Sequence, residues 1–294
     1  MDNNIVSVGM PTYNNARTVT RAMESVFAQS HTKWRLYVSD DHSTDDTRQH
    51  VSELARQRPD QVILMHPEER QYYMNFRRLL EAAETRYFVW LAGDDWWEPD
   101  FLKRSLGALE AHPEAVAAMA RCRFHTGEGA SHIDPGANAL EGDACSRVAT
   151  YLLRPDQTRM YGLYRRDALV QSFPPKVVHA YDWYLCAGTL RLGSHVSVDE
   201  VLLNRERTPS DDYLDTVERD EPSRILRFFP ALRMTVLGLR NGVFPVRMKV
   251  IFALFHLNLL KNLEQVRKRL PRIAWLLSPL YFLLLRLAKM LARL

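Results

Sequence analysis

The chain has 294 residues, 46% of them hydrophobic, a length and composition that allow a sizeable core and exclude an intrinsically disordered protein. Its net charge of +4 conceals an asymmetry: residues 1–223 carry 25 basic and 34 acidic side chains, whereas residues 224–294 carry 14 basic side chains and one acid, Glu264. Such a split predicts two regions with different surroundings, the basic one facing nucleic acid or an anionic membrane.

Cysteine usage and the N-terminus indicate the compartment. The three cysteines are widely spaced and form no Cys-x-x-Cys pair, so neither a disulfide framework nor a zinc site is indicated, and a reducing compartment is expected. The first residues lack a basic segment followed by an apolar one, so we predict no signal peptide. We therefore expect the protein on the cytoplasmic side.

Strand and helix patterns alternate over the first hundred residues, which predicts a mostly parallel sheet flanked by helices, an α/β fold. We expect strands at residues 5–9, 34–39, 62–65 and 87–91, and helices at residues 16–30, 47–58 and 72–84. In such a sheet the ligand site gathers at the carboxyl ends of the strands.

The pattern becomes less regular further along the chain. We expect a helix at 101–112, a strand at 115–121, a mobile polar loop at 127–142, a helix near 180–192 and a strand at 195–204. The charged stretch 207–221 then ends the predicted catalytic domain, residues 1–222, and residues 223–294 form a basic, amphipathic helical extension.

The extension is rich in Leu, Phe and Arg. Its longest charge-free run near the end, residues 273–285, has 13 residues, fewer than the roughly 20 that a membrane-spanning helix needs. Arg286, Lys289 and Arg293 recur at spacings of three and four, which predicts a helix that lies in a membrane interface. Nucleic-acid binding is disfavoured because no binding module is recognisable. Packing on the catalytic domain, or pairing with a second copy, stays an alternative.

Two adjacent acids, Asp94 and Asp95, follow the apolar run that ends at Leu91. Paired carboxylates at this position suit Mg²⁺ or Mn²⁺, because such a cation takes one or two protein oxygens and completes its shell with phosphate and water. The alternative is a turn before a helix, in which Asp caps the helix and Pro99 occupies its first turn.

Three motifs together resemble the family 2 glycosyltransferases of the GT-A fold, in that family's order and spacing. They are Pro-Thr-Tyr-Asn at 11–14, Ser-Asp-Asp-His-Ser at 39–43 and Gly-Asp-Asp at 93–95. The resemblance implies a Rossmann-like domain that binds a nucleotide-sugar, expected to be a UDP-sugar, as co-substrate together with Mn²⁺ or Mg²⁺. It assigns the metal to Asp95 and the donor to the other motif residues, Pro11, Thr12, Tyr13, Asn14, Asp41 and Asp94, with Asn75 as a further donor contact.

The resemblance also implies a general base, because inverting transfer removes a proton from the acceptor hydroxyl. His-Ala-Tyr-Asp-Trp at 179–183 resembles the element that carries it, which makes Asp182 the candidate, with an N-cap role as the alternative. One departure stands out: many relatives carry Arg-x-His after the last catalytic strand, where this chain has Arg207 in place of His. A guanidinium cannot ligate a cation, although it can pair with diphosphate oxygens.

The expected activity is inverting transfer of a single sugar to a glycan or polyprenyl-diphosphate-linked acceptor in surface polysaccharide assembly. Polymerisation is disfavoured because the Gln-x-x-Arg-Trp element of processive synthases is absent. The protein is expected to bind the cytoplasmic face of the membrane peripherally, without nucleic acid, and homo-oligomers stay open. The alternative from another class is a non-catalytic nucleotide-sugar-binding scaffold that its basic tail recruits to the membrane.

Overall fold

The computed structural model describes residues 5–126, 129–134, 138–156, 158–176, 178–207, 217, 221 and 223–293. The chain forms two compact units, each built from several segments. The sheet unit comprises Met1–Ala139, Thr158–Gln171 and His195–Arg207, and the helical unit comprises Leu140–Gln157, Ser172–Ser194 and Thr208–Leu294.

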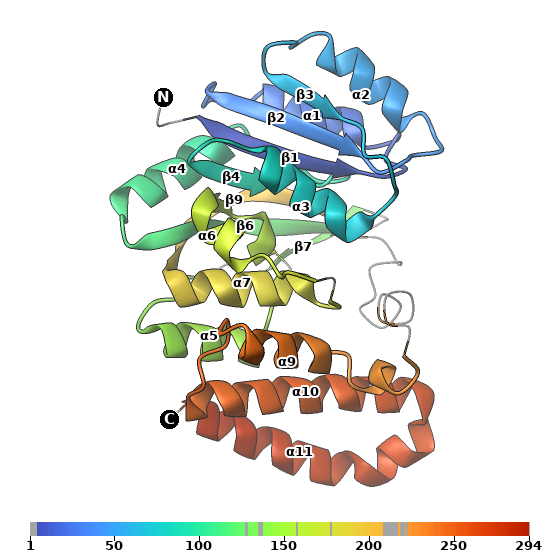
Figure 1. The fold of residues 1–294 in the computed structure, drawn as a ribbon, viewed down its shortest axis with the longest axis vertical. Coiled ribbons are helices and arrows are strands. Elements are labelled where there is room, and N and C mark those ends of the chain that lie inside the picture. Colours follow the sequence, from blue (N-terminus) through green and yellow to red (C-terminus); the bar gives the residue numbers. More distant parts are fainter. Residues whose placement is uncertain are drawn as a thin grey trace. The chain divides into compact units, whose positions relative to one another are not determined.

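Four parallel strands form one half of the sheet, in the spatial order β3-β2-β1-β4 (Figure 1). Every residue of β1 is buried, as expected for a strand covered on both faces. The helices α1, α2 and α3 connect consecutive strands, because parallel neighbours need a crossover. The bounds are β1 Val6–Thr12, β2 Trp34–Asp40, β3 Val62–Met65 and β4 Tyr87–Trp90, with α1 Val19–Phe27, α2 Thr47–Ala55 and α3 Tyr72–Ala82.

The other half of the sheet contains antiparallel pairs. A short strand, β8, lies between β4 and β6 and runs antiparallel to both, while β7 pairs with β6 and β5 pairs with β9. The helix α4 packs against β6 and β8. The bounds are β5 Trp96–Trp97, β6 Ala115–Thr126, β7 Ala130–Asp134, β8 Leu163–Arg165 and β9 Ser194–Arg207, with α4 Phe101–Ala111, the 3₁₀ turn η2 Arg159–Tyr161 and α6 Arg166–Ser172.

The helical unit is built around the long helix α10, which packs against α5 and α11, while α7 packs against α5 and α9. Figure 1 shows α10 and α11 as a hairpin of long helices. The bounds are α5 Ala144–Leu153, α7 Tyr181–Leu192, the 3₁₀ turn η4 Leu226–Phe228, α9 Leu232–Arg240, α10 Met248–Arg269 and α11 Pro271–Arg293.

Polar side chains of α10 link it to its neighbours. The amide nitrogen of Asn258 donates to Oγ1 of Thr235 on α9 at 2.8 Å. The amide nitrogen of Asn262 donates to the carbonyl oxygen of Phe228 at 2.7 Å, and its amide oxygen accepts a short hydrogen bond from the Tyr281 hydroxyl on α11. Three neighbouring elements are thus joined to α10 by directed hydrogen bonds as well as by apolar contact.

The predicted α/β sheet with flanking helices and long C-terminal helices is confirmed. The prediction of a mobile loop over residues 127–142 is wrong in part, because residues 130–134 form β7, which pairs with residues 122–126 of β6; residues 127, 128 and 135–137 lie outside the described part of the chain. The predicted domain boundary after residue 222 stays a prediction. The compact units divide the chain differently, since the helical unit also includes α5 and α7.

Candidate active site

The first motif loop begins inside β1, which extends to Thr12, beyond the predicted end at residue 9. The chain then turns at Asn14, whose φ of +53° lies in the left-handed region that Asn tolerates. The backbone N–H of Asn14 donates to the Ser43 hydroxyl at 2.9 Å, and its side-chain oxygen accepts from the backbone N–H of Thr44 at 2.8 Å. The loops after β1 and β2 therefore hold each other.

The second loop carries two buried acids with different contacts. The carboxylate of Asp40 accepts from the backbone N–H and the hydroxyl of Ser43, which fixes the loop internally. The backbone N–H of Asp41 donates to the Thr12 carbonyl at 2.8 Å, and its carboxylate accepts from the backbone N–H of Gln71 at 2.9 Å. Asp41, a predicted donor contact, is therefore held between the end of β1 and the segment that precedes α3.

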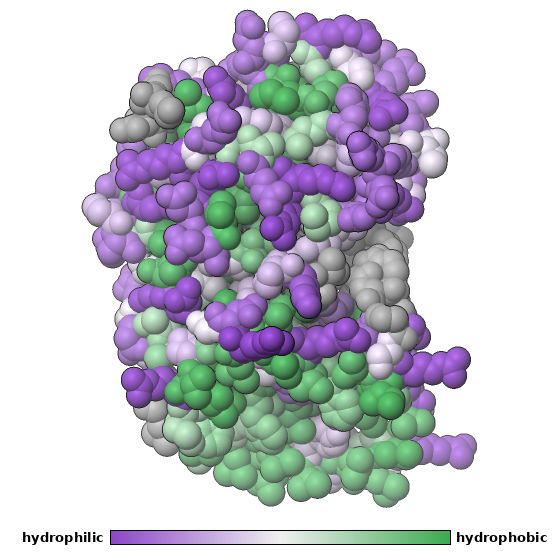
Figure 2. Space-filling model, viewed as in Figure 1, coloured by the Kyte–Doolittle hydropathy of each residue, from purple (hydrophilic) through white to green (hydrophobic). Residues whose placement is uncertain are grey.

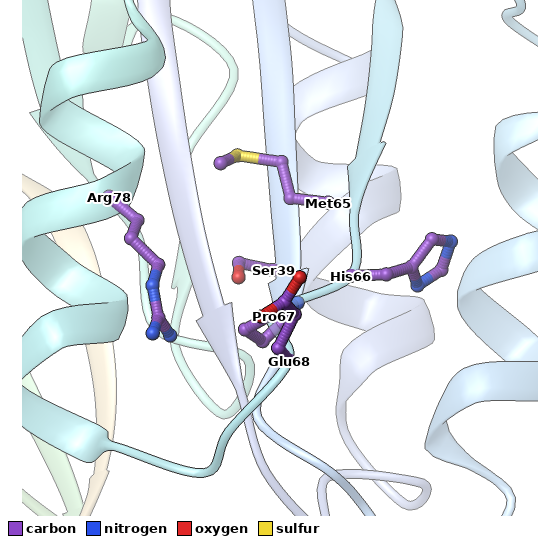
Figure 3. Close-up of a pocket in the computed structure, with 6 residues that line it drawn as sticks. All are labelled: Ser39, Met65, His66, Pro67, Glu68 and Arg78. Carbon is purple, nitrogen blue, oxygen red and sulfur yellow. The ribbon is translucent and has the colours of Figure 1, made fainter.

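A pocket of about 370 Å³ opens beside this loop (Figure 3). It is lined by residues at the carboxyl ends of β2 and β3 and by one side chain of α3, namely Ser39, Met65, His66, Pro67, Glu68 and Arg78. Its position agrees with the rule that ligands bind outside the carboxyl ends of parallel strands. The pocket thus lies next to the second motif loop, where the sequence places the nucleotide.

Two of the predicted donor contacts have partners within the protein. Asn75 is buried, and its side-chain nitrogen donates to the Ser39 carbonyl at 3.0 Å, so it supports the end of β2; its contact with a donor stays a prediction. Tyr13 already has a partner on its ring, because the guanidinium carbon of Arg70 lies 3.7 Å from the ring centroid. Arg70 carries no motif signal, so the sequence did not single it out.

The third motif brings Asp95 to a fully buried position after β4. One carboxylate oxygen, Oδ2, accepts from Nε of Arg205 at 2.9 Å. The other, Oδ1, is buried and accepts no hydrogen bond from the described residues. Asp94 is half-buried, and its backbone carbonyl accepts from Arg21 at 3.3 Å. The two adjacent acids therefore have distinct surroundings, and the roles predicted for them stay predictions.

Burial dominates the electrostatics of Asp95. Burial, with a smaller contribution from the neighbouring Asp94, raises the pKa of Asp95 to about 7 against the opposing effect of Arg205. Burial lowers the pKa of Arg205, but the Asp95 carboxylate outweighs it and the pKa is raised overall. Arg205 is thus a permanent cation, whereas the charge of Asp95 depends on what else binds near it.

Arg205 is a site residue that the sequence analysis missed. Its guanidinium carbon lies 4.3 Å from the Tyr161 ring centroid and 5.6 Å from that of Phe124. Arg205 therefore contacts two aromatic rings while it pairs with Asp95. The signal was present, because Arg205 opens the Arg-x-Arg that stands for Arg-x-His. Arg207, the arginine predicted to pair with diphosphate, ends β9, and its side chain lies outside the described part of the structure.

A second cluster surrounds Trp96, the residue after Asp95. The guanidinium carbon of Arg21 lies 3.6 Å from the Trp96 ring centroid, and Arg21 also pairs with Glu206 at 2.7 Å. The His125 ring lies 4.7 Å from the same tryptophan, and its Nε2 lies 2.9 Å from the side-chain oxygen of Asn204. These contacts join α1, β5, β6 and β9 next to the acid pair.

The donor set for a divalent cation is small. Among the described residues no group of three or more His, Cys, Asp or Glu side chains is placed to hold a metal. Asp95 nevertheless fits the chemistry, because its buried Oδ1 lacks a partner and Mg²⁺ commonly takes one or two carboxylates plus substrate phosphates. The residues present suit a metal that the substrate helps to bind.

Asp182, the predicted base, lies in the first turn of α7 in the helical unit. The residue that precedes this helix, Ala180, has φ +60°, a left-handed conformation that is disfavoured for alanine. Such strain often marks a functional turn. The catalytic role of Asp182 stays a prediction.

Comparison with known proteins identifies the class. Residues 7–173, more than half of the chain, match the family described as Glycosyl transferase family 2, and the chain belongs to that family. It is 33% identical over 175 residues to an uncharacterized glycosyltransferase of Nostoc sp., covering 58% of this chain and 53% of the relative. Over 110 residues it is 32% identical to an Escherichia coli protein, UDP-Glc:alpha-D-GlcNAc-diphosphoundecaprenol beta-1,3-glucosyltransferase WfgD, covering 37% of this chain and 42% of that one. The chain spans about half, or less, of the length of these curated relatives.

Solved structures show the same fold. TarS 1–349 of S. aureus, in complex with UDP-GlcNAc, matches with a TM-score of 0.59 at 15% identity, covering 98% of this chain and 89% of that chain. The mannosyltransferase PcManGT of Pyrobaculum calidifontis, in complex with GDP-Man and Mn²⁺, matches with a TM-score of 0.52 at 17% identity, covering 98% and 83%. The GT-A resemblance inferred from the three motifs is therefore confirmed.

Proposed function

We propose that the protein is an inverting glycosyltransferase that moves one sugar from a UDP-sugar to a membrane-associated glycan or lipid-linked acceptor in surface polysaccharide assembly. The observation that carries the proposal is the connection of the three motif loops. Gly93 donates its backbone N–H to the Pro11 carbonyl at 3.3 Å, and Asp41 donates to the Thr12 carbonyl at 2.8 Å. Motifs that lie far apart in the sequence thus form one edge, next to the buried carboxylate of Asp95.

Two comparisons support the choice of substrates. A fold relative binds UDP-GlcNAc, and a sequence relative is named for a UDP-Glc donor and a diphosphoundecaprenol-linked acceptor. We assign donor binding to the motif residues and to two further positions, a set that comprises Pro11, Thr12, Tyr13, Asn14, Asp41, Asn75, Asp94 and Arg207.

Asp95 is assigned the role of holding the metal ion that stabilises the leaving group. Its unpartnered Oδ1 would hold Mn²⁺ or Mg²⁺, which when bound neutralises the negative charge that develops on the departing nucleoside diphosphate. Arg205 keeps Oδ2 of this carboxylate fixed, and Arg207 would pair with diphosphate oxygens. Asp182 would accept the proton of the acceptor hydroxyl as the new glycosidic bond forms and the bond to the nucleoside diphosphate breaks.

The C-terminal helices are proposed to bring the protein to the cytoplasmic face of the membrane, where a lipid-linked acceptor is available. The 14 basic side chains of residues 224–294, against one acid, support this part of the proposal. The short charge-free run of residues 273–285 supports peripheral attachment, and the absence of a Gln-x-x-Arg-Trp element supports transfer of a single sugar.

The test is a nucleoside-diphosphate release assay with the full chain, Mn²⁺, a panel of nucleotide-sugars and a membrane lipid extract. Asp95→Asn should lower release at least about 100-fold, the range for loss of one electrostatic stabiliser of the transition state. Asp60→Asn, an exposed acid on a loop, is the matched control and should keep full activity. Donor binding by calorimetry without release under any condition would favour the scaffold alternative instead.

A further inference from the structure

The helical unit has an unusually apolar exterior. Of the 21 large hydrophobic side chains that are exposed among the described residues, 17 lie between residues 225 and 290. Figure 2 shows a largely hydrophobic surface over α10 and α11 on the face in view. Monomeric proteins in water rarely expose so large an apolar area, which usually marks a protein or membrane contact.

The exposed face of α11 is organised as a stripe. Leu276, Leu280, Leu283 and Leu287 recur at spacings of four, three and four residues, and they are 68%, 54%, 56% and 43% exposed. Their spacing places them on one side of the helix. We call these four residues the leucine stripe. A different side of α11, formed by Ala274, Leu285, Ala288 and Ala292, is buried, so packing against α10 leaves the stripe uncovered.

Cations lie at both ends of α11, before and after its charge-free run. Arg272, Arg286, Lys289 and Arg293 are exposed, and no acidic residue occurs in α11. An apolar face bordered by Lys and Arg is typical of helices that lie in a membrane interface, because the cations reach anionic headgroups while the apolar side chains enter the acyl boundary. This arrangement of charge favours an anionic bilayer over a second copy, since two such helices would repel each other.

The charges also decide between lying in the membrane and crossing it. Among the described residues, α11 is the one helix that is long and apolar enough to cross by length and composition. Its charge-free run from residue 273 to 285, however, extends only about 20 Å at 1.5 Å per residue, whereas the hydrocarbon core is about 30 Å thick. A spanning orientation would draw Arg286 or Lys289 into hydrocarbon, which is costly.

We propose that α11 lies in the plane of an anionic membrane surface, with the leucine stripe in the acyl boundary and the four cations among the headgroups. The inference rests on the proposed function only in taking the acceptor to be at a membrane. Binding is measurable without any transfer reaction, so its failure and the failure of the transferase assignment are distinguishable.

The first experiment is sedimentation of the full chain with vesicles of phosphatidylcholine alone or with 30% phosphatidylglycerol. Leu276→Glu/Leu283→Glu should abolish binding to both. The control Ile63→Glu/Val170→Glu changes the net charge by the same amount, at exposed apolar sites of the sheet unit. It should bind the vesicles as the wild type does. Arg286→Gln/Lys289→Gln should weaken binding to the anionic vesicles about 25-fold, at about fivefold per cation. Equal binding by the wild type and the leucine-stripe variant would overturn the proposal.

The second experiment measures depth. Nitroxide labels are placed singly at Leu276→Cys and Leu287→Cys in a Cys145→Ser background, because the other cysteines are buried. In-plane orientation predicts the same depth at both sites, since both belong to the leucine stripe. A spanning helix predicts depths about 16 Å apart, from 11 residues at 1.5 Å each. Such a difference, or exposure of both labels to aqueous relaxation agents in vesicle-bound protein, would contradict the proposal.

Discussion

The pairing of Asp95 with Arg205 determines the character of the candidate site at the scale of single residues. Both groups are buried, and each favours the charged form of the other: Arg205 opposes the rise that burial causes in the pKa of Asp95, and the Asp95 carboxylate raises the pKa of Arg205. Removing one partner of a buried ion pair leaves the other uncompensated, which is usually far more destabilising than removing both. Arg205 is therefore expected to matter for folding as well as for positioning the carboxylate.

Arg205→Met should lower the free energy of unfolding by up to about 3 to 5 kcal/mol at a pH well above 7, where Asp95 is ionised, because it leaves the Asp95 carboxylate buried without its cation. Asp95→Asn/Arg205→Met should be much less destabilised than the sum of the single variants, as urea denaturation would measure. Additive effects of the two substitutions would show that the pair is not coupled.

Gly93 connects the third motif to the first by close approach. A Cβ at this position would lie 2.8 Å from the side-chain oxygen of Asn15, which accepts from the backbone N–H of Tyr13. Gly93→Ala should therefore displace Asn15 and disorder the loop after β1, raising KM for the donor several-fold. Gly107→Ala is the control, since nothing lies near its Cβ position, and it should leave KM unchanged. An unaltered KM in Gly93→Ala would contradict the argument.

At the scale of elements, α5 begins with a well-formed cap. The carboxylate of Asp143 accepts from the backbone N–H and the hydroxyl of Ser146, each at 2.9 Å. These hydrogen bonds hold the pKa of Asp143 below its ordinary value of 3.8. Because the folded-state pKa is depressed, the stabilisation is fully present above pH 4 and is lost as the pH falls through the folded-state pKa.

Asp143→Ala should accordingly lower Tm at pH 7, whereas Asp143→Asn, which keeps an acceptor for the cap, should lower it less. The difference in Tm between wild type and Asp143→Ala should shrink when the melting curves are repeated below the folded-state pKa. A difference that stays constant from pH 7 down to acidic conditions would mean that the carboxylate charge plays no part.

The sequence predicted those elements whose patterning is local. The strands at 34–40, 62–65 and 87–90 and the helices α2, α3 and α4 fall within a few residues of expectation, because buried parallel strands are short apolar runs and surface helices are amphipathic. The elements that were not predicted include β5, β7 and β8, which have two, five and three residues, and the helices α5 and α6. β7, for example, is a strand only because β6 offers it an edge.

The residues of the candidate site that belong to local motifs were predictable, and those defined by distant contacts were not. Motif loops at strand ends are local, and the structure brings Asp41, Gly93 and Thr12 to one edge as the topology requires. Arg205 and Arg70 were not predicted, because their importance arises from contacts with Asp95 and Tyr13 that are distant in sequence. No periodicity or spacing encodes such pairings.

At the scale of the whole molecule, the exposed apolar surface of the helical unit should govern behaviour in solution. Without detergent the full chain should self-associate into a broad distribution of species, and non-ionic detergent above its critical micelle concentration should convert it to a monomer. Size-exclusion chromatography with light scattering measures both states. Leu276→Glu/Leu283→Glu should narrow the distribution in the absence of detergent. A discrete dimer that detergent does not change would contradict this expectation.

The hydrogen bonds that α10 makes through Asn258 and Asn262 should keep the helical unit together when the protein moves from water to a lipid surface. Apolar contact stabilises helix association strongly only where water surrounds the helices, and this stabilisation weakens once lipid replaces the water. Directed polar links do not depend on that contrast. One side of the helical unit can therefore move from water into lipid while the helices around α10 keep the same contacts. Binding to a bilayer and release from it then require no refolding, so attachment can be reversible.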